Sequence, residues 1–192
     1  PSSGDHCRLA RFAGLHAFVH AADIGGGYHF EPAPGTRRRH SGAGRAQIRL
    51  LGAGRLRAVL EVVTPLRVPA RYERETARPA GVRTLRLISR FTVEAGSPLV
   101  RVETQLDNTA SHYRLRLRLP TGLRWGTAHA DASFAVHANS SDRWPGDPDQ
   151  LAHPMRSFVS VSAAGRGLSV ITRGLHEYAL ATDAAGAAVV EV

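Results

Sequence analysis

Two histidines four residues apart, His16 and His20, are the first side chains whose spacing could carry chemistry. On an α-helix this spacing would place both imidazoles on one face, an arrangement that suits zinc. The run from His16 to His20 alternates equally well as a β-strand, and no third ligand follows at a spacing typical of a zinc site. We therefore predict no metal site in this chain.

Acidic residues offer a second kind of chemistry, because a glycosidase works with two carboxylates roughly 5 to 9.5 Å apart. The candidates are Asp131, Asp142, Asp147, Asp149 and Glu177. Nothing in their spacing selects a pair. No G-x-S-x-G nucleophile motif occurs, and the glycine run at 25–27 lacks the lysine and the serine or threonine of a phosphate-binding loop. We predict no catalytic residue in this chain.

The chain of 192 residues is strongly basic, with a formal net charge of +9, yet all 25 of its basic residues are arginine. A nucleic-acid-binding protein usually mixes arginine with lysine, which serves well as a plain counter-charge for phosphate. Arginine in place of lysine, beside abundant alanine, glycine and valine, is typical of a GC-rich genome. The one tight cluster, residues 37–40, follows prolines and a glycine and is expected in a solvated loop. We expect no nucleic-acid partner.

Apolar runs and cysteine usage bear on cellular location. The longest apolar stretches, such as residues 58–63, are far shorter than the roughly 20 apolar residues that span a bilayer. No signal-peptide pattern is found at the start of the sequence. Cys7 is the only cysteine, which excludes a disulfide within the chain and fits a reducing compartment. These features predict a cytoplasmic chain with no membrane partner.

Alternation of apolar residues with a period of two returns along most of the sequence from residue 46 and predicts β-strands. In the clearest case, residues 114–119, three leucines alternate with three arginines, so the leucines face a core and the arginines face the other way. Turns with glycine at residues 52–54 and 96–98 join neighbouring strands into hairpins. About ten short strands predict a single all-β domain over residues 1–192, folded as an antiparallel β-sandwich.

Four segments, in chain order, carry a resemblance to a known family: residues 23–32, 107–121, 128–134 and 174–178. Their strongest elements are DIGGGYHFEP, DNTA with RLR and PT, AHADASF and GLHEY. Together they resemble the C-terminal β-sandwich region of glycoside hydrolase family 38, the α-mannosidases. The chain departs from the family pattern at Gly26, His112, Tyr113 and Asn139, so contacts made from these positions in the family are not carried over.

The resemblance implies an accessory role. Family members are much longer, and their zinc ion and catalytic carboxylate lie in an α/β domain that this chain lacks. The sequence is therefore expected to be a domain excised from a longer α-mannosidase-like chain, inactive alone, with a galactose-mutarotase-like supersandwich fold. Its expected partners are the catalytic domain of its own parent chain and carbohydrate in the form of mannosides.

Site residues follow from the same motifs. Asp23, Tyr28, Asp131 and Trp144 are the candidates for substrate binding or for the domain interface. Trp144 lies in a loop rich in proline and aspartate, where an aromatic face could stack on a sugar ring or plug the end of the sandwich.

Other polar residues of the motifs are assigned structural roles. These are Arg114, Arg116, Glu177 and Tyr178. Opposite charges on neighbouring strands stabilise sheets, so the arginines are expected to pair with carboxylates such as Glu103 and Glu177.

Two alternative functions stay open from sequence. A stand-alone mutarotase-like or sugar-binding domain would need a histidine facing a glutamate in a groove, with His112 or His129 and Glu177 as candidates. A nucleic-acid-binding domain would use residues 37–40 and the arginines of residues 114–119.

Overall fold

The structure, a computed structural model, describes residues 14–26, 29–43, 45–124, 127–140 and 152–192. Within these ranges the regular structure consists of β-strands and one turn of 3₁₀-helix. Every strand pair with a defined register is antiparallel. No helix among the described residues is long and apolar enough to cross a membrane. The prediction of an all-β, antiparallel fold is confirmed.

The chain divides into two compact units that share strand β9. Residues 17–117 form one unit, here called the hairpin unit, and residues 1–16 with 118–192 form the other, here called the C-terminal unit. The single domain expected over residues 1–192 stays a prediction.

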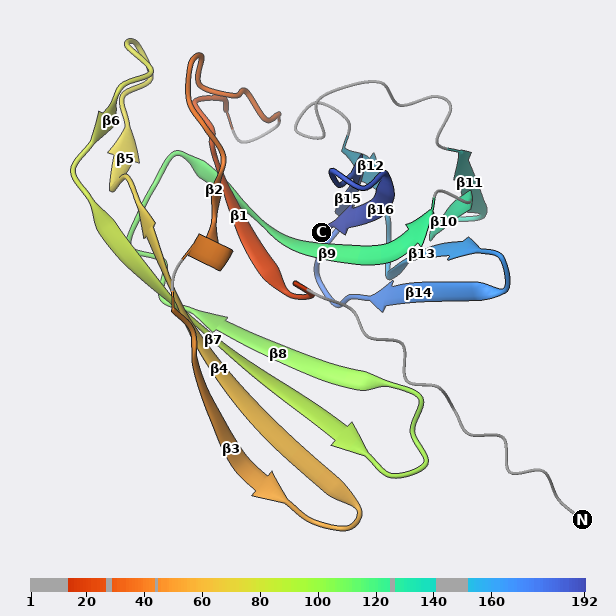
Figure 1. The fold of residues 1–192 in the computed structure, drawn as a ribbon. Helices are drawn as coiled ribbons and strands as arrows, with labels where there is room; N and C mark the ends of the chain where they lie inside the picture. Colours follow the sequence, from red (N-terminus) through yellow and green to blue (C-terminus); the bar gives the residue numbers. More distant parts are fainter. Residues whose placement is uncertain (1–13, 27–28, 44, 125–126, 141–151) are drawn as a thin grey trace, which may run out of the picture. The chain divides into compact units, whose positions relative to one another are not determined.

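The hairpin unit contains two long hairpins and several short strands (Figure 1). A four-stranded sheet has the order β3-β4-β7-β8, β5 pairs with β6, and β9 and β2 flank β1. The elements are β1 (Ala17–Ala22), β2 (Arg39–His40), η1 (Ser41–Ala43), β3 (Gln47–Ala53), β4 (Arg57–Val68), β5 (Arg71–Tyr72), β6 (Pro79–Ala80), β7 (Arg83–Glu94), β8 (Val100–Leu106) and the first residues of β9 (Tyr113–Arg124).

The predicted hairpins are present, but their strands are longer than expected. β4 and β7 have 12 residues each and pair along their whole length, from Arg57 opposite Glu94 to Val68 opposite Arg83. Pro65 fits inside β4 because β3 pairs only with residues 58–63, so the edge of β4 at Pro65 needs no amide donor for β3.

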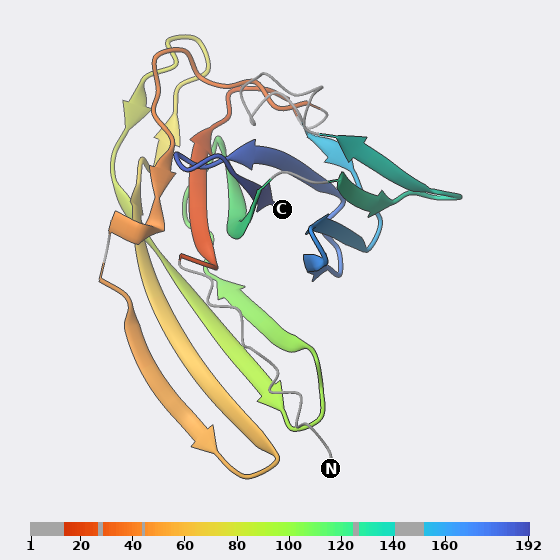
Figure 2. The same ribbon diagram turned by 45° about the vertical axis from the view of Figure 1, so that its right-hand side comes forward.

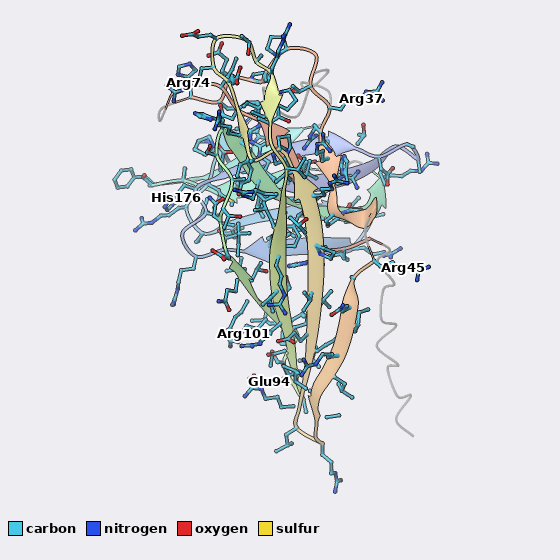
Figure 3. The ribbon with its side chains drawn as sticks, turned by 90° about the vertical axis from the view of Figure 1, so that its left-hand side faces the viewer. Arg37, Arg45, Arg74, Glu94, Arg101 and His176 are labelled. Atoms are coloured by element: carbon cyan, nitrogen blue, oxygen red, sulfur yellow. The ribbon has the colours of Figure 1, made fainter. Side chains whose placement is uncertain are left out.

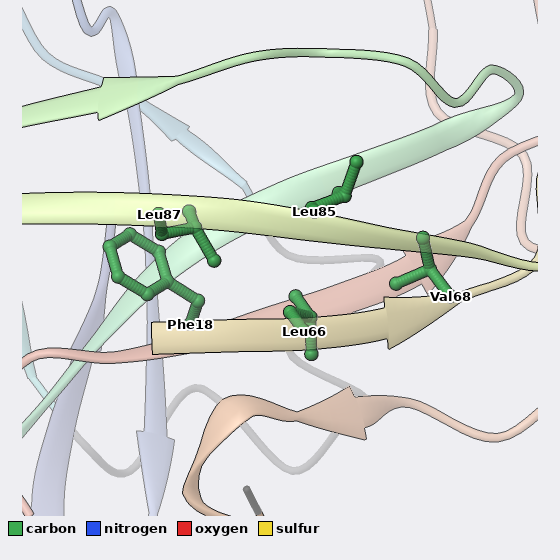
Figure 4. Packing of buried hydrophobic residues seen from close by; sticks show 5 residues of the cluster. All are labelled: Phe18, Leu66, Val68, Leu85 and Leu87. Carbon is green, nitrogen blue, oxygen red and sulfur yellow. The ribbon is translucent and has the colours of Figure 1, made fainter. Parts of the chain in front are cut away.

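The core of the hairpin unit lies between two sheets (Figure 4). The inner ends of β4 and β7 contribute Leu66, Val68, Leu85 and Leu87, and β1 contributes Phe18. The partly buried side chains packed against them are Leu106, Ala110, Tyr113, Leu115 and Leu117. Alternate residues of each strand thus meet across the two sheets, which is the packing of a β-sandwich.

The C-terminal unit contains one further four-stranded sheet and part of the six-stranded sheet β12-β15-β16-β9-β1-β2, visible in Figure 2 at another angle. The four-stranded sheet has the order β11-β10-β13-β14. In the six-stranded sheet the second half of β9 pairs with β16, β16 pairs with β15, and β15 pairs with β12. The strands are β10 (Thr127–Asp131), β11 (Val136–Ser140), β12 (His153–Pro154), β13 (Phe158–Ala163), β14 (Arg166–Ile171), β15 (Glu177–Thr182) and β16 (Ala187–Glu191).

Strand β9 shows how far the leucine–arginine alternation predicts burial. Leu119 is buried, and Leu115 and Leu117 pack against the core of the hairpin unit while staying partly exposed. Arg116, on the opposite side of the strand, is also buried. Both sides of β9 are therefore covered in part, which a simple division into core and solvent faces does not anticipate.

Candidate functional site

Asp23 organises the loop that follows β1. Its Oδ1 accepts hydrogen bonds from the backbone amides of Gly25 at 3.0 Å and Glu31 at 3.1 Å. A side chain at Gly25 would place its Cβ 2.5 Å from the carbonyl oxygen of His29, so only glycine fits there. The carboxylate thus closes the two ends of the loop onto each other.

Arginines flank this loop. The guanidinium of Arg114 lies over the ring of Phe30, 3.5 Å from its centroid, in a cation–π contact. Arg74 donates a hydrogen bond to the carbonyl oxygen of Gly25 at 3.3 Å. Arg74 is labelled in Figure 3. The contact of Arg114 with Phe30 joins β9 to this loop, and the structural role assigned to Arg114 stays a prediction.

A buried histidine lies close to this loop, inside a cluster of aromatic rings. The imidazole of His20 stacks on Tyr113, with 4.9 Å between ring centroids, and is tilted against Tyr72 at 6.2 Å. His20 is fully buried, and neither of its ring nitrogens has a hydrogen-bond partner. Burial, with a smaller contribution from the charge of Arg39, lowers the pKa of His20 to about 4. The imidazole is therefore neutral at pH 7.

The structure resolves the ambiguity of the His16–His20 run. His20 lies in β1, and His16 lies in a turn before it with φ of 71°. The helical alternative is therefore wrong. No three histidine, cysteine, aspartate or glutamate side chains gather into a metal site in the part of the chain that the structure describes.

Asp131, at the end of β10, accepts several hydrogen bonds from a turn far along the chain. Its Oδ1 accepts from the backbone amides of Arg156, Ser157 and Phe158 at 3.2, 2.8 and 2.9 Å, and its Oδ2 accepts from the Ser157 hydroxyl at 2.5 Å. Because these donors favour the charged carboxylate, they hold the pKa of Asp131 well below its usual range. The geometry gives Asp131 the role of an anchor for the start of β13.

Removal of this carboxylate tests the anchor. We expect Asp131→Ala to lower the melting temperature at pH 7 by roughly a few degrees, because three amides and a hydroxyl lose their acceptor. Asp131→Asn keeps one acceptor oxygen and should melt between the two. Thermal unfolding followed by circular dichroism measures the order. An alanine variant that melts with the wild type would show that the turn does not depend on Asp131.

Tyr178 lies in a second polar group of the C-terminal unit. Its hydroxyl accepts a hydrogen bond from Nδ2 of Asn139 at 2.5 Å, and its ring is tilted against His153 at 5.2 Å. Tyr178 is buried, and burial raises its pKa. Glu177, the preceding residue, is exposed at the start of β15, opposite Pro154 of β12. Asn139 of β11, one of the positions where the chain departs from the family pattern, thus supports Tyr178 of β15 from a strand of another sheet.

The arginines of β9 differ in their surroundings. Arg118 pairs with the buried Glu191 of β16, with 3.8 Å between Nε and Oε1. Arg116 is only 3% exposed. Glu103, expected as a partner of these arginines, lies opposite Arg90 in the β7–β8 register. Since Arg116 is buried and Arg118 is paired, this strand does not present a row of free cations to phosphate.

Two of the sequence-predicted site residues, Tyr28 and Trp144, lie outside the described residues. The other two, Asp23 and Asp131, belong to different units. Each carboxylate accepts hydrogen bonds from backbone amides of this protein. Binding of substrate by any of the four stays a prediction.

Sequence reasoning missed the cluster of His20, Tyr72 and Tyr113. These residues come from three distant segments, so no local spacing connects them. The available signal was the alternation of Phe18 and His20, which would place the histidine on a strand face beside a core residue.

Comparisons with known proteins place this geometry in a wider context. No family model matches the chain. A protein of Halalkalibacterium halodurans named "Putative mannosylglycerate hydrolase" is 27% identical over 187 residues, which covers 88% of this chain and 21% of that protein. This chain therefore spans about a fifth of the length of this relative.

Solved structures share the fold. An α-mannosidase from Enterococcus faecalis V583 superposes with a TM-score of 0.82 and 22% identity, covering 94% of this chain and 22% of that one. A family 38 glycosyl hydrolase from Enterococcus faecalis superposes with a TM-score of 0.81 and 20% identity, covering 94% and 23%. The resemblance indicated by the four motifs is thereby confirmed, and the chain has the fold of a segment of family 38 α-mannosidases, about a fifth of their length.

Proposed function

We propose that this chain is the non-catalytic β-domain of a family 38 α-mannosidase-like glycoside hydrolase. The observation that carries the proposal is how much of each protein takes part in the structural match. Almost the whole chain, 94%, superposes on an α-mannosidase, yet it accounts for only 22% of that enzyme. A domain of this kind supports the catalytic domain and contributes to the binding of carbohydrate.

The names of the matched proteins suggest the substrate class. One is an α-mannosidase and the other carries the name of a mannosylglycerate hydrolase. Both names describe the hydrolysis of mannosides, so we propose a mannoside as the substrate of the complete enzyme, acting in the cytoplasm.

The catalytic groups belong elsewhere in this proposal. Asp23 accepts hydrogen bonds from backbone amides of its own loop, and Asp131 accepts them from a turn 25 to 27 residues later in the chain. Such bonds suit structural anchors better than acid–base catalysts. The zinc ion that the family resemblance implies finds no cluster of three ligands among the described residues. We therefore assign the zinc and the catalytic carboxylates to another part of the polypeptide.

The purified chain of 192 residues is accordingly expected to show no turnover of nitrophenyl α-mannoside, with or without added zinc. The physical reason is that hydrolysis needs two suitably spaced carboxylates, and the spacing of the acidic residues in the sequence selects no such pair. Release of nitrophenol followed by absorbance measures this directly. Turnover that persists after contaminating host enzyme has been removed would contradict the proposal.

A further inference from the structure

The sheet β3-β4-β7-β8 has two faces of opposite chemistry. In an antiparallel sheet, residues directly opposite each other lie on the same face. One row across all four strands is Leu50, Leu60, Phe91 and Val102. The row beside it, toward the hairpin tips, is Ala53, Ala58, Val93 and Val100. We call these two rows the distal apolar face.

The other face of the same strands is charged. The adjacent residues form the row Arg49, Glu61, Arg90 and Glu103, in which the sign of the charge alternates from strand to strand. Arg90 and Glu61 form an ion pair at 3.1 Å. Arg101 and Glu94, which also face this side, are labelled in Figure 3 near the tips of the hairpins. Arg90, Arg101 and Glu94 on this face are exposed to solvent, and the buried Glu61 is paired with Arg90.

The distal apolar face continues the core of the hairpin unit. Leu66, Leu85 and Leu87 lie farther along the same side of β4 and β7, where they are buried. Between core and distal face lies a row with Ile48 and Val62, in which the hydroxyls of Ser89 and Thr104 are 3.0 Å apart and satisfy each other.

Several side chains of the distal apolar face are exposed to solvent, although they continue the apolar pattern of the buried core. Leu50 is 64% exposed, Val100 58%, Val93 45% and Val102 39%, and Ile48 in the intervening row is 65% exposed. A contiguous apolar patch of this kind, with its opposite face charged, is typical of a surface that another protein segment covers.

We propose that the distal apolar face is a docking surface for another domain of the same polypeptide. This inference rests on the proposed function. The matched proteins are about five times longer than this chain, so roughly four-fifths of each lies outside the shared segment and can supply the cover. The continuity of the face with the unit's own core favours such a permanent intrachain contact, because obligate interfaces resemble a core cut in two. The partner surface is apolar and lies flat across four strands.

Single cysteines report whether the face is covered. In a Cys7→Ser background, Leu50→Cys and Val102→Cys place a thiol on the distal apolar face. Arg49→Cys and Arg101→Cys place one on the charged face of the same strands, one residue away. The rate of maleimide labelling, followed by mass spectrometry, is compared between the complete gene product and the 192-residue chain, after circular dichroism has shown that each variant is folded.

We expect labelling at Leu50→Cys and Val102→Cys to be slower by at least about tenfold in the complete gene product, because the core of an interface is as tightly packed as a protein interior. Labelling at Arg49→Cys and Arg101→Cys should be the same in both proteins. Equal rates at all four positions would overturn the inference. Protection in the 192-residue chain that rises with its concentration would show that a second copy covers the face, and would also overturn it.

The labelling result is independent of the proposed function. An exposed face in a complete gene product that hydrolyses mannosides only when this domain is present would refute the docking surface alone. A covered face in a gene product without mannosidase activity would refute the enzyme assignment and leave the docking surface standing.

Discussion

Leu85→Ala is expected to lower the free energy of unfolding of this chain by about 3 to 5 kcal/mol. Leu85 has no exposed surface and lies in the middle of the cluster with Leu66, Val68 and Leu87 on one side of the sheet and Phe18 across from it. Truncation removes buried methyl groups and leaves a cavity that the two sheets cannot close without moving together.

A matched leucine controls for the substitution itself. Leu56, between β3 and β4, is 77% exposed, so Leu56→Ala removes the same atoms from a site that water already reaches. Urea unfolding of the two variants beside the wild type gives the comparison. Equal midpoints for Leu85→Ala and the wild type would mean that the core is not where the structure places it.

The second large effect is a loss of stability in acid that depends on His20. The folded protein holds the pKa of His20 near 4, whereas an unfolded histidine titrates near 6.5. Because the pKa is lower in the folded state, the unfolded state takes up the proton at a higher pH than the folded state does. The contribution of the neutral histidine is therefore complete above pH 6.5 and is lost as the pH falls toward 4, by about 3 kcal/mol.

The groups around His20 also disfavour its protonation in the folded state. Tyr72 and Tyr113, whose own pKa values are raised by burial, offer the imidazolium no negative charge, and Arg39 repels it. His20→Phe keeps a ring of similar shape in the stack and removes the titration, so its stability should fall less between pH 7 and pH 4 than that of the wild type.

Denaturant unfolding at the two pH values measures this difference. His176→Phe, at an exposed position labelled in Figure 3, is the matched control and should keep the pH dependence of the wild type. If His20→Phe and the wild type lose equal stability between pH 7 and pH 4, the acid sensitivity arises from other groups and His20 is not the buried neutral side chain described here.

The strands could be predicted where alternation is strong, and so could the partners joined by a short glycine turn, but the pairing of distant strands could not. Leu115, Leu117 and Leu119 mark β9 clearly, but the sequence does not reveal that β16 lies beside it and supplies Glu191 to Arg118. Pairing between distant strands depends on register, which local pattern does not specify. For the same reason the position of Glu103 was predicted wrongly. It was expected beside the arginines of β9, and it lies opposite Arg90 of β7.

The candidate site was predicted in the same partial way. The motif around Asp23 marked the loop that the Asp23 carboxylate closes, but the close approach of Gly25 to the carbonyl of His29 follows only from the structure. The role of Asp131 depends on a turn 25 to 27 residues later in the chain, and no spacing rule connects the two. Leu117, an obvious core residue by alternation, is only partly buried, so its truncation should cost less than that of Leu85.

The central claim is that this β-domain serves a catalytic domain carried by the same polypeptide. Its most direct test is the kcat/KM for nitrophenyl α-mannoside of the complete gene product and of the same polypeptide without residues 1–192. We predict that the complete protein hydrolyses the substrate and that the deletion lowers kcat/KM by more than about a hundredfold, because small displacements of catalytic groups have costs of this size. Full activity without residues 1–192, in a protein that remains folded, would contradict the claim.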